Sequence, residues 1–279
     1  KMSDDRGTNA VLALVQSLAP AVAYKESNLE SNRKIWNLYA KDWQPDRDWV
    51  RKMADNLGDE WKDDANPLTF VGDEWSDRRS LDQVLEEFVS PFCPSGAVSG
   101  EIGCGGGRVA ARVIPGCSQF HCFDISKEML RRARESFSAG GIACSAGDSK
   151  DCIKYTLLES NTLPADLTDT FDFIYSFDCL PHCDLHTIFA YLKEMKRLLK
   201  PGCSGMIHTS NLLAPAGFAR FAQQKSASVQ GFCFVTPDAV QKLVSEVGLE
   251  MVKESVVGAA GVDNIYYNRD YLCVFKKAY

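Results

Sequence analysis

The residues with the clearest chemical meaning in this 279-residue sequence form a glycine-rich turn, Glu101-Ile102-Gly103-Cys104-Gly105-Gly106-Gly107. A β-strand that ends in such a turn and leads into a helix brings its backbone close to a ligand at the carboxyl edge of a parallel sheet. A dinucleotide-binding turn would need another glycine at position 108, where this chain has Arg108. An acidic side chain in the turn repels a pyrophosphate and suits a ligand with an ammonium group and no phosphate. The pattern therefore disfavours a nicotinamide-dependent oxidoreductase.

A second carboxylate follows at the end of the next apolar run. Asp124 ends the run 119–123, a short distance after the glycine turn. A carboxylate at the end of the second strand of such a unit can accept hydrogen bonds from both hydroxyls of a ribose. The two acidic residues therefore predict one binding site for a ligand with an ammonium group and a ribose.

The pattern after residue 93 indicates the scaffold that must position these residues. Short β-like runs alternate there with helical patterns, which is typical of βαβ units around a parallel sheet. We expect strands over 97–102, 119–123, 142–146, 171–177, 204–209, 251–257 and 271–276. We expect helices over 108–113, 126–137, 184–199 and 236–247, with Ser126 and Thr236 as caps. Residues 150–169 are predicted to be irregular, and residues 210–235 to form a loop or lid over a site.

Taken together, these segments resemble the class I S-adenosylmethionine-dependent methyltransferases. The resemblance rests on the glycine turn, on Phe123-Asp124-Ile125-Ser126, on Gly147-Asp148-Ser149, on the run 171–177 and on Leu198-Leu199-Lys200-Pro201-Gly202. These segments occur in the expected order over residues 95–279. We therefore expect an α/β fold, a doubly wound seven-stranded and mostly parallel sheet (Rossmann-like methyltransferase fold), with the last strand antiparallel. Residues 1–94 are predicted to form an N-terminal helical cap and residues 95–279 the S-adenosylmethionine-binding domain.

The resemblance also implies which residues hold the methionine and ribose parts of S-adenosylmethionine. In the family the glycine turn lies against the methionine moiety, a role that would fall on Glu101, Gly103 and Gly105. The carboxylate that ends the second strand binds the ribose, which implies Asp124.

The resemblance implies further contacts to the adenine and from the end of the fourth strand. The resemblance implies that Ile125 packs on the adenine with Met129 near it, and that Asp148 meets the adenine amino group with Ser149 beside it. Asp148 could instead be a helix cap. Phe177 ends the fourth strand, where the family often contacts the cofactor through backbone atoms.

Methyl transfer to a hydroxyl needs a base to take the proton, whereas a thiol-derived or amine nucleophile needs little further help. The segment 178–186 follows the fourth strand, where the acceptor should lie, and His182 is its best candidate for the base. The alternative is that His182 only lines or caps the next helix. Asp178 could orient the acceptor or cap the turn.

The same segment contains Cys179, His182, Cys183 and His186, all of them residue types that bind zinc. Neighbouring residues 182 and 183 point apart in a helix and in a strand, and four ligands within eight residues rarely close a tetrahedron. We therefore predict no metal site.

Aromatic residues outside the predicted sheet are further candidates for contacts with the cofactor or the acceptor. The segment 36–43 resembles the aromatic N-terminal helix that many small-molecule methyltransferases fold over the cofactor, and we expect Tyr39 to contact the sulfonium end. Core packing between cap and sheet is the alternative for these rings. The segment 266–270 either lines the acceptor pocket or forms a hairpin turn.

Composition narrows the class of partner. The net charge is −6, with 31 Lys and Arg against 37 Asp and Glu and no long block of like charge. This balance disfavours nucleic acid or an anionic membrane as a partner. No apolar run is long enough to cross a bilayer. The 11 scattered cysteines fit a reducing compartment, and we expect them to be free thiols.

The sequence begins with Lys1, so we expect that an upstream segment was removed. The expected location is the cytoplasm, or an organelle interior if that segment was a transit peptide. The expected function is methyl transfer from S-adenosylmethionine to a small-molecule acceptor. The alternative is a non-catalytic methyltransferase-like subunit or scaffold of a larger assembly, with protein partners that the sequence does not identify.

Overall fold

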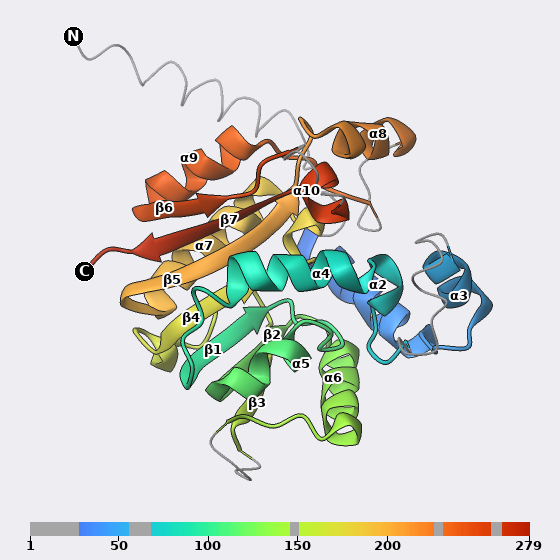
Figure 1. Cartoon of the computed structure of the whole chain (residues 1–279), viewed down its shortest axis with the longest axis horizontal. Helices are drawn as coiled ribbons and strands as arrows, with labels where there is room; N and C mark the ends of the chain where they lie inside the picture. Colours follow the sequence, from blue (N-terminus) through green and yellow to red (C-terminus); the bar gives the residue numbers. More distant parts are fainter. Residues whose placement is uncertain (1–27, 56–67, 146–150, 226–230, 258–263) are drawn as a thin grey trace, which may run out of the picture.

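The protein is represented by a computed structural model that describes residues 28–55, 68–145, 151–225, 231–257 and 264–279. The described strands form one seven-stranded sheet in the order β3-β2-β1-β4-β5-β7-β6 (Figure 1). The strands are β1 Ala97–Ile102, β2 Cys117–Asp124, β3 Ile153–Leu157, β4 Phe171–Ser176, β5 Leu199–Ser210, β6 Leu249–Glu254 and β7 Asp270–Lys277. β7 runs antiparallel to both of its neighbours, β5 and β6, and the other neighbouring strands of this sheet are parallel. The predicted fold class is therefore confirmed.

Helices α4, α5 and α6 cover one face of this sheet, and α7 and α9 cover the other. The described α-helices are α2 Asn28–Asp42, α3 Asp48–Asp55, α4 Arg78–Val84, α5 Ala110–Val113, α6 Lys127–Gly140, α7 Leu185–Leu198, α8 Pro215–Gln223, α9 Pro237–Val247 and α10 Ile265–Arg269. Ser126 caps α6 as predicted, because its hydroxyl accepts the backbone N–H of Met129 at 3.1 Å. Thr236 occupies the cap position of α9 without a side-chain hydrogen bond, and Gly248 ends that helix in the left-handed conformation.

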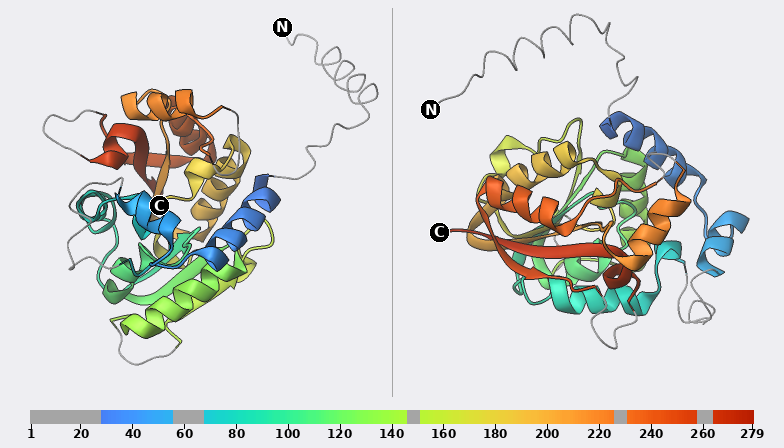
Figure 2. Two further views of the ribbon diagram at one scale, coloured as in Figure 1. Left: turned by 90° about the vertical axis from the view of Figure 1, so that its right-hand side faces the viewer. Right: turned by 90° about the horizontal axis from the view of Figure 1, so that it is seen from above.

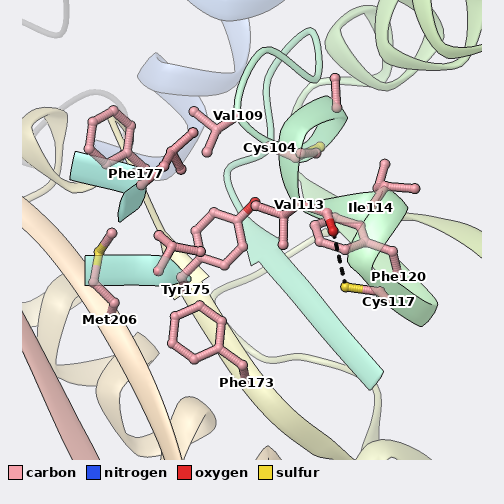
Figure 3. Packing of buried hydrophobic residues seen from close by; sticks show 14 of the residues in the cluster. Cys104, Val109, Val113, Ile114, Cys117, Phe120, Phe173, Tyr175, Phe177 and Met206 are labelled. Carbon is pink, nitrogen blue, oxygen red and sulfur yellow. Dashed lines mark hydrogen bonds between the residues drawn. The ribbon is translucent and has the colours of Figure 1, made fainter. Parts of the chain in front are cut away.

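The core has one half on each face of the sheet, because successive strand residues point to opposite faces. Phe173 and Tyr175 of β4 pack with α4, α5 and α6 on one face, and Figure 3 shows this cluster together with Phe177. Ile174 of the same strand packs with α7 and α9 on the other face. The alternation places the end of β4, and the residues that follow it, at the carboxyl edge between the two layers.

The third strand differs from the prediction. Residues 142–145 form no strand; Cys144 packs in the core, and Ser145 donates hydrogen bonds to the carbonyl of Cys117. The strand beside β2 is Ile153–Leu157 instead, within the segment predicted to be irregular. It is an edge strand whose side chains are half-buried or exposed, so its mixed polar and apolar residues hid it.

Other segments are more regular than predicted. Residues 210–235 include the helix α8, and residues 265–269 form α10, so the segment 266–270 is not a simple hairpin turn. β5 also begins earlier than predicted, at Leu199. No helix in the described part of the chain is long and apolar enough to cross a membrane.

The N-terminal region divides into two parts. Helices α2 and α3 lie beside the carboxyl edge of the sheet, with α2 against α6 (Figure 2). Helix α4 instead packs Leu81 and Val84 into the same core as the sheet residues Phe120 and Tyr175. A division of the chain near residue 94 thus remains a proposal, and this packing argues for placing it before α4.

Candidate functional site

A cavity lies at the carboxyl edge of β1, β2 and β4, beneath α2. Its walls bring together seven of the predicted site residues: Glu101, Gly103, Gly105, Asp124, Ile125, Met129 and Phe177. We refer to this space as the first cavity.

The glycine turn between β1 and α5 forms the floor of the first cavity. Gly103 has φ +73°, and a Cβ there would lie 2.3 Å from the sulfur of Cys179. Gly105 has φ +54°, and a Cβ there would meet no atom within 4 Å. The first glycine is therefore required by its neighbours, whereas the second leaves an open space beside the backbone in which a ligand can lie.

Asp124 is buried at the end of β2, and its two carboxylate oxygens are already oriented. Oδ2 accepts the backbone N–H of Gly105 at 2.8 Å, and Oδ1 accepts that of Ser126 at 2.7 Å. Burial raises the pKa of this carboxyl to about 6, because the two backbone hydrogen bonds offset only part of the desolvation. Each oxygen keeps a second lone pair, so the ionised side chain can accept both hydroxyls of a ribose.

Glu101 is also buried, at 1% exposure, on β1 at the base of the first cavity. The hydroxyl of Tyr175 donates to its Oε2 at 3.1 Å. Burial raises the pKa of Glu101 well above its ordinary value. A bound ammonium group would favour the ionised carboxylate, so the site matches the cation predicted from the turn.

The donor and acceptor set of the first cavity fits S-adenosylmethionine. Asp124 suits the ribose, Glu101 suits the ammonium group, and the space at Gly105 admits the chain that joins them. Ile125 and Met129 supply apolar surface beside Asp124. These contacts remain proposals, and the chemistry of the donor set supports them.

Three predicted cofactor-binding residues, Asp148, Ser149 and Tyr39, are not among the described residues that line the first cavity. Asp148 and Ser149 lie outside the described residues, and they precede β3 rather than follow it. The position after β3 is held by Leu158, which lines the first cavity. Tyr39 does not line that cavity: Trp75 Nε1 donates to its hydroxyl at 2.8 Å, and this hydroxyl donates to Glu74. The aromatic residue of α2 at the first cavity is Trp36 instead.

Helix α2 covers the site because polar side chains hold it to the sheet edge. Asn32 is buried and donates to the carbonyl of His182 at 3.2 Å. Arg33 donates to the carbonyl of Leu158 at 3.1 Å. Asn37 accepts the hydroxyl of Ser126 at 2.9 Å. α2 is thus attached to the segments that follow β2, β3 and β4.

A second cavity, wider and more open than the first, lies on the other side of α2. The rings of Trp36, Tyr39, Trp49 and Trp75 line one side of it, and Trp36 packs edge-on against Tyr39 and Trp75 with centroids 5.7 and 5.8 Å apart. Trp36, Trp75 and Asp178 line both cavities. The two spaces therefore adjoin at these three side chains.

Asp178 is held in place at this junction. It has φ +53°, an uncommon conformation for a residue other than glycine. Its carboxylate pairs with the guanidinium of Arg108 and accepts the hydroxyl of Tyr266 at 3.1 Å. Its backbone N–H donates to Nδ1 of His208 at 3.0 Å. This bond places the proton of a neutral His208 on Nε2, 3.0 Å from Asp270.

His182 is the last residue of the short helix Leu180–His182 and lies on the wall of the second cavity. Its Nδ1 donates to the carbonyl of Gly231 at 3.0 Å, which leaves Nε2 as an unprotonated acceptor. Burial lowers the pKa of His182 to about 4, so the ring is neutral near pH 7. Its ring packs edge-on against Trp36 at 4.9 Å. The geometry is that of a hydrogen-bond acceptor or base facing the second cavity.

Arg108 was not predicted as a site residue, and Asp178 was expected either to orient the acceptor or to cap the turn. Arg108 is 8% exposed and donates to Ser76 at 2.8 Å in addition to its pair with Asp178. Its position next to the last glycine of the turn was the available signal, because an arginine there needs a buried anion. In the described part of the chain, no group of three or more His, Cys, Asp or Glu side chains is placed to hold a metal ion.

Comparison with families of known sequence gives one match at this site. A family described as a methyltransferase domain matches residues 101–202, from the glycine turn to the start of β5. A search of curated protein sequences returns no match.

Solved structures give several matches of similar quality. An S-adenosylmethionine-dependent methyltransferase from Methanosarcina mazei is 15% identical with a TM-score of 0.54, covering 69% of this chain and 97% of its own. The partner of the Trm112 methyltransferase activator in a complex from Haloferax volcanii is 16% identical with a TM-score of 0.56, covering 88% and 98%. The [4+2]-cyclase SpnF is 15% identical with a TM-score of 0.54, covering 74% and 82%. At these identities the matches show the shared fold, on which more than one reaction occurs.

Proposed function

We infer from the family match and the shared fold that the chain is a class I S-adenosylmethionine-dependent methyltransferase. The acceptor is proposed on that basis. We propose that the chain transfers the methyl group to a small-molecule acceptor bound in the second cavity. The observation that carries this proposal is the junction at Trp36, Trp75 and Asp178, which line both cavities. The two cavities therefore adjoin across these three side chains, and we propose that the reacting groups lie at this junction.

The enclosure of the junction favours a small acceptor over a macromolecule. Several aromatic rings line the second cavity, and α2, which forms one of its walls, is attached to the sheet edge through Asn32 and Asn37. A net charge of −6 disfavours nucleic acid as the acceptor. Cavities with apolar walls and a few polar groups are typical of small-molecule sites.

The roles of this chain's residues follow from their positions. Bound S-adenosylmethionine supplies an electrophilic methyl group on its sulfonium. Asp124 and Glu101 hold the ribose and the ammonium group, and Trp36 with α2 excludes water from the junction. With a hydroxyl acceptor, Nε2 of His182 takes the proton that the oxygen loses. Orientation of the two reactants supplies much of the acceleration in such a displacement.

The test has two steps with one control variant. Calorimetric titration of the full chain with S-adenosylhomocysteine should give micromolar binding, about −8 kcal/mol. Incubation with methyl-labelled S-adenosylmethionine and a cell extract should then place label in products of low molecular mass. An Asp124→Asn variant should lose both signals. Label found only in protein or RNA would contradict a small-molecule acceptor, and failure to bind S-adenosylhomocysteine would contradict the cofactor site itself.

A further inference from the structure

Two arginines share one aromatic ring on the wall of the second cavity. The guanidinium carbon of Arg220, on α8, lies 4.2 Å from the centroid of Phe232. That of Arg269, at the end of α10, lies 5.1 Å from the same centroid. Both arginines and the ring line the cavity. Arg220 keeps an exposed surface, as expected of a residue at the opening of a binding site.

Close packing of α8 on α10 brings the two arginines together. A Cβ at Gly217 would lie 2.0 Å from the carbonyl oxygen of Asn211 and 2.7 Å from that of Arg269. Only a glycine allows the backbones to approach this closely. Arg220 follows Gly217 by three residues and so lies on the same side of α8. The arrangement of the arginines is therefore built into the helix packing.

The negative charge near this pair is insufficient for two guanidinium groups. Asp270 is fully buried and accepts Nε of Arg269 at 2.9 Å and Nη2 at 2.6 Å. No carboxylate in the described part of the chain pairs with Arg220. Partial burial and the nearby Arg269 lower the pKa of Arg220. Two like charges held close together in this way are stabilised by an added anion.

The acids of the second cavity, in contrast, already have partners. Glu74 accepts Trp43 Nε1 at 2.9 Å in addition to Tyr39. Asp42 accepts Trp49 Nε1 at 2.9 Å and pairs with Arg47 at 3.0 Å. Asp178 is paired with Arg108. Asp42 and Asp178 are ion-paired and Glu74 is hydrogen-bonded, whereas Arg220 has no carboxylate partner in the described part of the chain, so the cavity offers more to an anionic acceptor than to a cationic one.

We propose that the acceptor carries a carboxylate, which binds at Arg220 and Arg269 while its planar body lies among the aromatic rings. This inference rests on the proposed function of the second cavity. Guanidinium groups match carboxylates in charge and geometry, and the free edge of Arg220 can form two parallel hydrogen bonds to one. Arg220 is then a specificity-determining residue for the acceptor.

The proposal also links acceptor binding to the base. Arg220 and Arg269 both contribute to the low pKa of His182. A carboxylate bound between them offsets their charge, so the pKa of His182 rises when an acceptor with this group is present. Nε2 of His182 becomes more basic only in the complex that needs it.

The experiment uses three probes of one shape and different charge. The full chain is saturated with S-adenosylhomocysteine and titrated with benzoate, benzamide and benzylamine, followed by saturation-transfer NMR. Benzoate should bind at least about tenfold more tightly than benzamide, and benzylamine more weakly than both. Arg220→Gln should abolish the preference for benzoate, and Arg220→Lys should keep part of it. Arg79→Gln, an exposed arginine on α4, is the matched control and should keep all of it.

The possible results separate this inference from the proposed function. Equal or tighter binding of benzamide or benzylamine would overturn the inference, as would no benzoate binding or an unchanged preference in Arg220→Gln. Each of these results would leave the cofactor site intact, because S-adenosylhomocysteine binding is measured in the same samples. Failure of the wild-type chain to bind S-adenosylhomocysteine would overturn the proposed function instead.

Discussion

The guanidinium of Arg108 and the carboxylate of Asp178 form an ion pair at the junction of the two cavities. Arg108 follows the glycine turn that forms the floor of the first cavity, and Asp178 follows β4 and lines the second. Ser76 and Tyr266 hydrogen-bond to the same guanidinium. The pair thus holds the glycine turn and the segment that follows β4 in a fixed position relative to each other.

The stability of this pair can be measured by substituting each partner. Arg108→Met leaves the Asp178 carboxylate largely buried without a cation, and we expect it to lower the free energy of unfolding by about 3–5 kcal/mol. Asp178→Asn keeps the uncommon backbone conformation, which asparagine tolerates. The double variant should lose less than the two single variants together. Guanidinium chloride unfolding monitored by circular dichroism gives all three values.

An exposed pair provides the control for this cycle. Arg131 and Glu135 pair at 2.6 Å on the outer face of α6, where both side chains are about half exposed. Arg131→Met should cost less than about 1 kcal/mol. Additive effects of Arg108→Met and Asp178→Asn would show that the two residues stabilise the fold independently.

Asp124 should determine cofactor affinity more than stability. In Asp124→Asn the side chain can no longer accept both Gly105 and Ser126 together with two ribose hydroxyls, since one oxygen becomes an amide. We expect the Kd for S-adenosylhomocysteine to rise at least tenfold. The free energy of unfolding should change by about 1 kcal/mol. Asp166→Asn, at an exposed site far from the cavity, should change neither value, and an unaltered Kd in Asp124→Asn would remove Asp124 from the site.

The same carboxyl predicts how binding depends on pH. Burial raises its pKa to about 6, and the ionised form is the one that accepts both ribose hydroxyls. Lowering the pH through 6 protonates Asp124, so the Kd should rise by up to about tenfold per pH unit below that value. Above pH 7 it should be constant. Calorimetry from pH 5 to 8 measures this, and a slope that persists in Asp124→Asn would assign it to another group.

The parts of the site that could be predicted are those formed by residues close together in the sequence. The glycine turn, Asp124 and the cap at Ser126 are short-range features, and the sequence analysis placed them correctly in the fold. The edge strand β3 escaped because one half-exposed strand has no distinctive period. The predicted contact of Asp148 depended on that strand; Asp148 lies outside the described residues, so the contact stays a prediction.

Long-range partners were harder to predict than the turn. Tyr39 was predicted to contact the sulfonium end of the cofactor, but its hydroxyl is engaged by Glu74 and Trp75, and it lines the second cavity instead of the first. The packing of α8 on α10 through Gly217 has no counterpart in any local pattern, because it depends on two backbones meeting in space. The arginines of the second cavity were therefore not predictable from the sequence alone.

Alanine substitutions in the glycine turn should distinguish a glycine required by packing from one that leaves space for a ligand. Gly103→Ala would place a Cβ against Cys179 at positive φ, so we expect a loss of about 2–4 kcal/mol in the free energy of unfolding. Gly105→Ala has positive φ but no clash, so it should cost only about 1 kcal/mol while its Cβ enters the first cavity. The Kd for S-adenosylhomocysteine should then rise about tenfold.

Gly116 provides the control for both variants. It has an ordinary φ, and a Cβ there would meet no atom within 4 Å. Gly116→Ala should leave the Kd unchanged. A Gly105→Ala variant that binds S-adenosylhomocysteine as tightly as the wild type would show that the ligand does not lie beside this backbone.

His182 should matter for rate and not for cofactor affinity. In His182→Gln the neutral acceptor Nε2 is lost, and with a hydroxyl acceptor we expect kcat to fall by about 10²–10⁴. The Kd for S-adenosylhomocysteine should stay within about twofold, because His182 lines the second cavity only. With an amine or thiol acceptor the loss should be much smaller, since such nucleophiles need no base of this kind.

The pH profile separates a base from a wall residue. The pKa of His182 is about 4, and the neutral ring is the active form, so wild-type kcat should be lost only as the pH falls through about 4 in the absence of a bound anion. A carboxylate in the second cavity should move this limb to higher pH, because it offsets the charge of Arg220 and Arg269. His182→Gln should lack the limb altogether. A variant that keeps the wild-type rate and the same limb would leave His182 as part of the cavity wall.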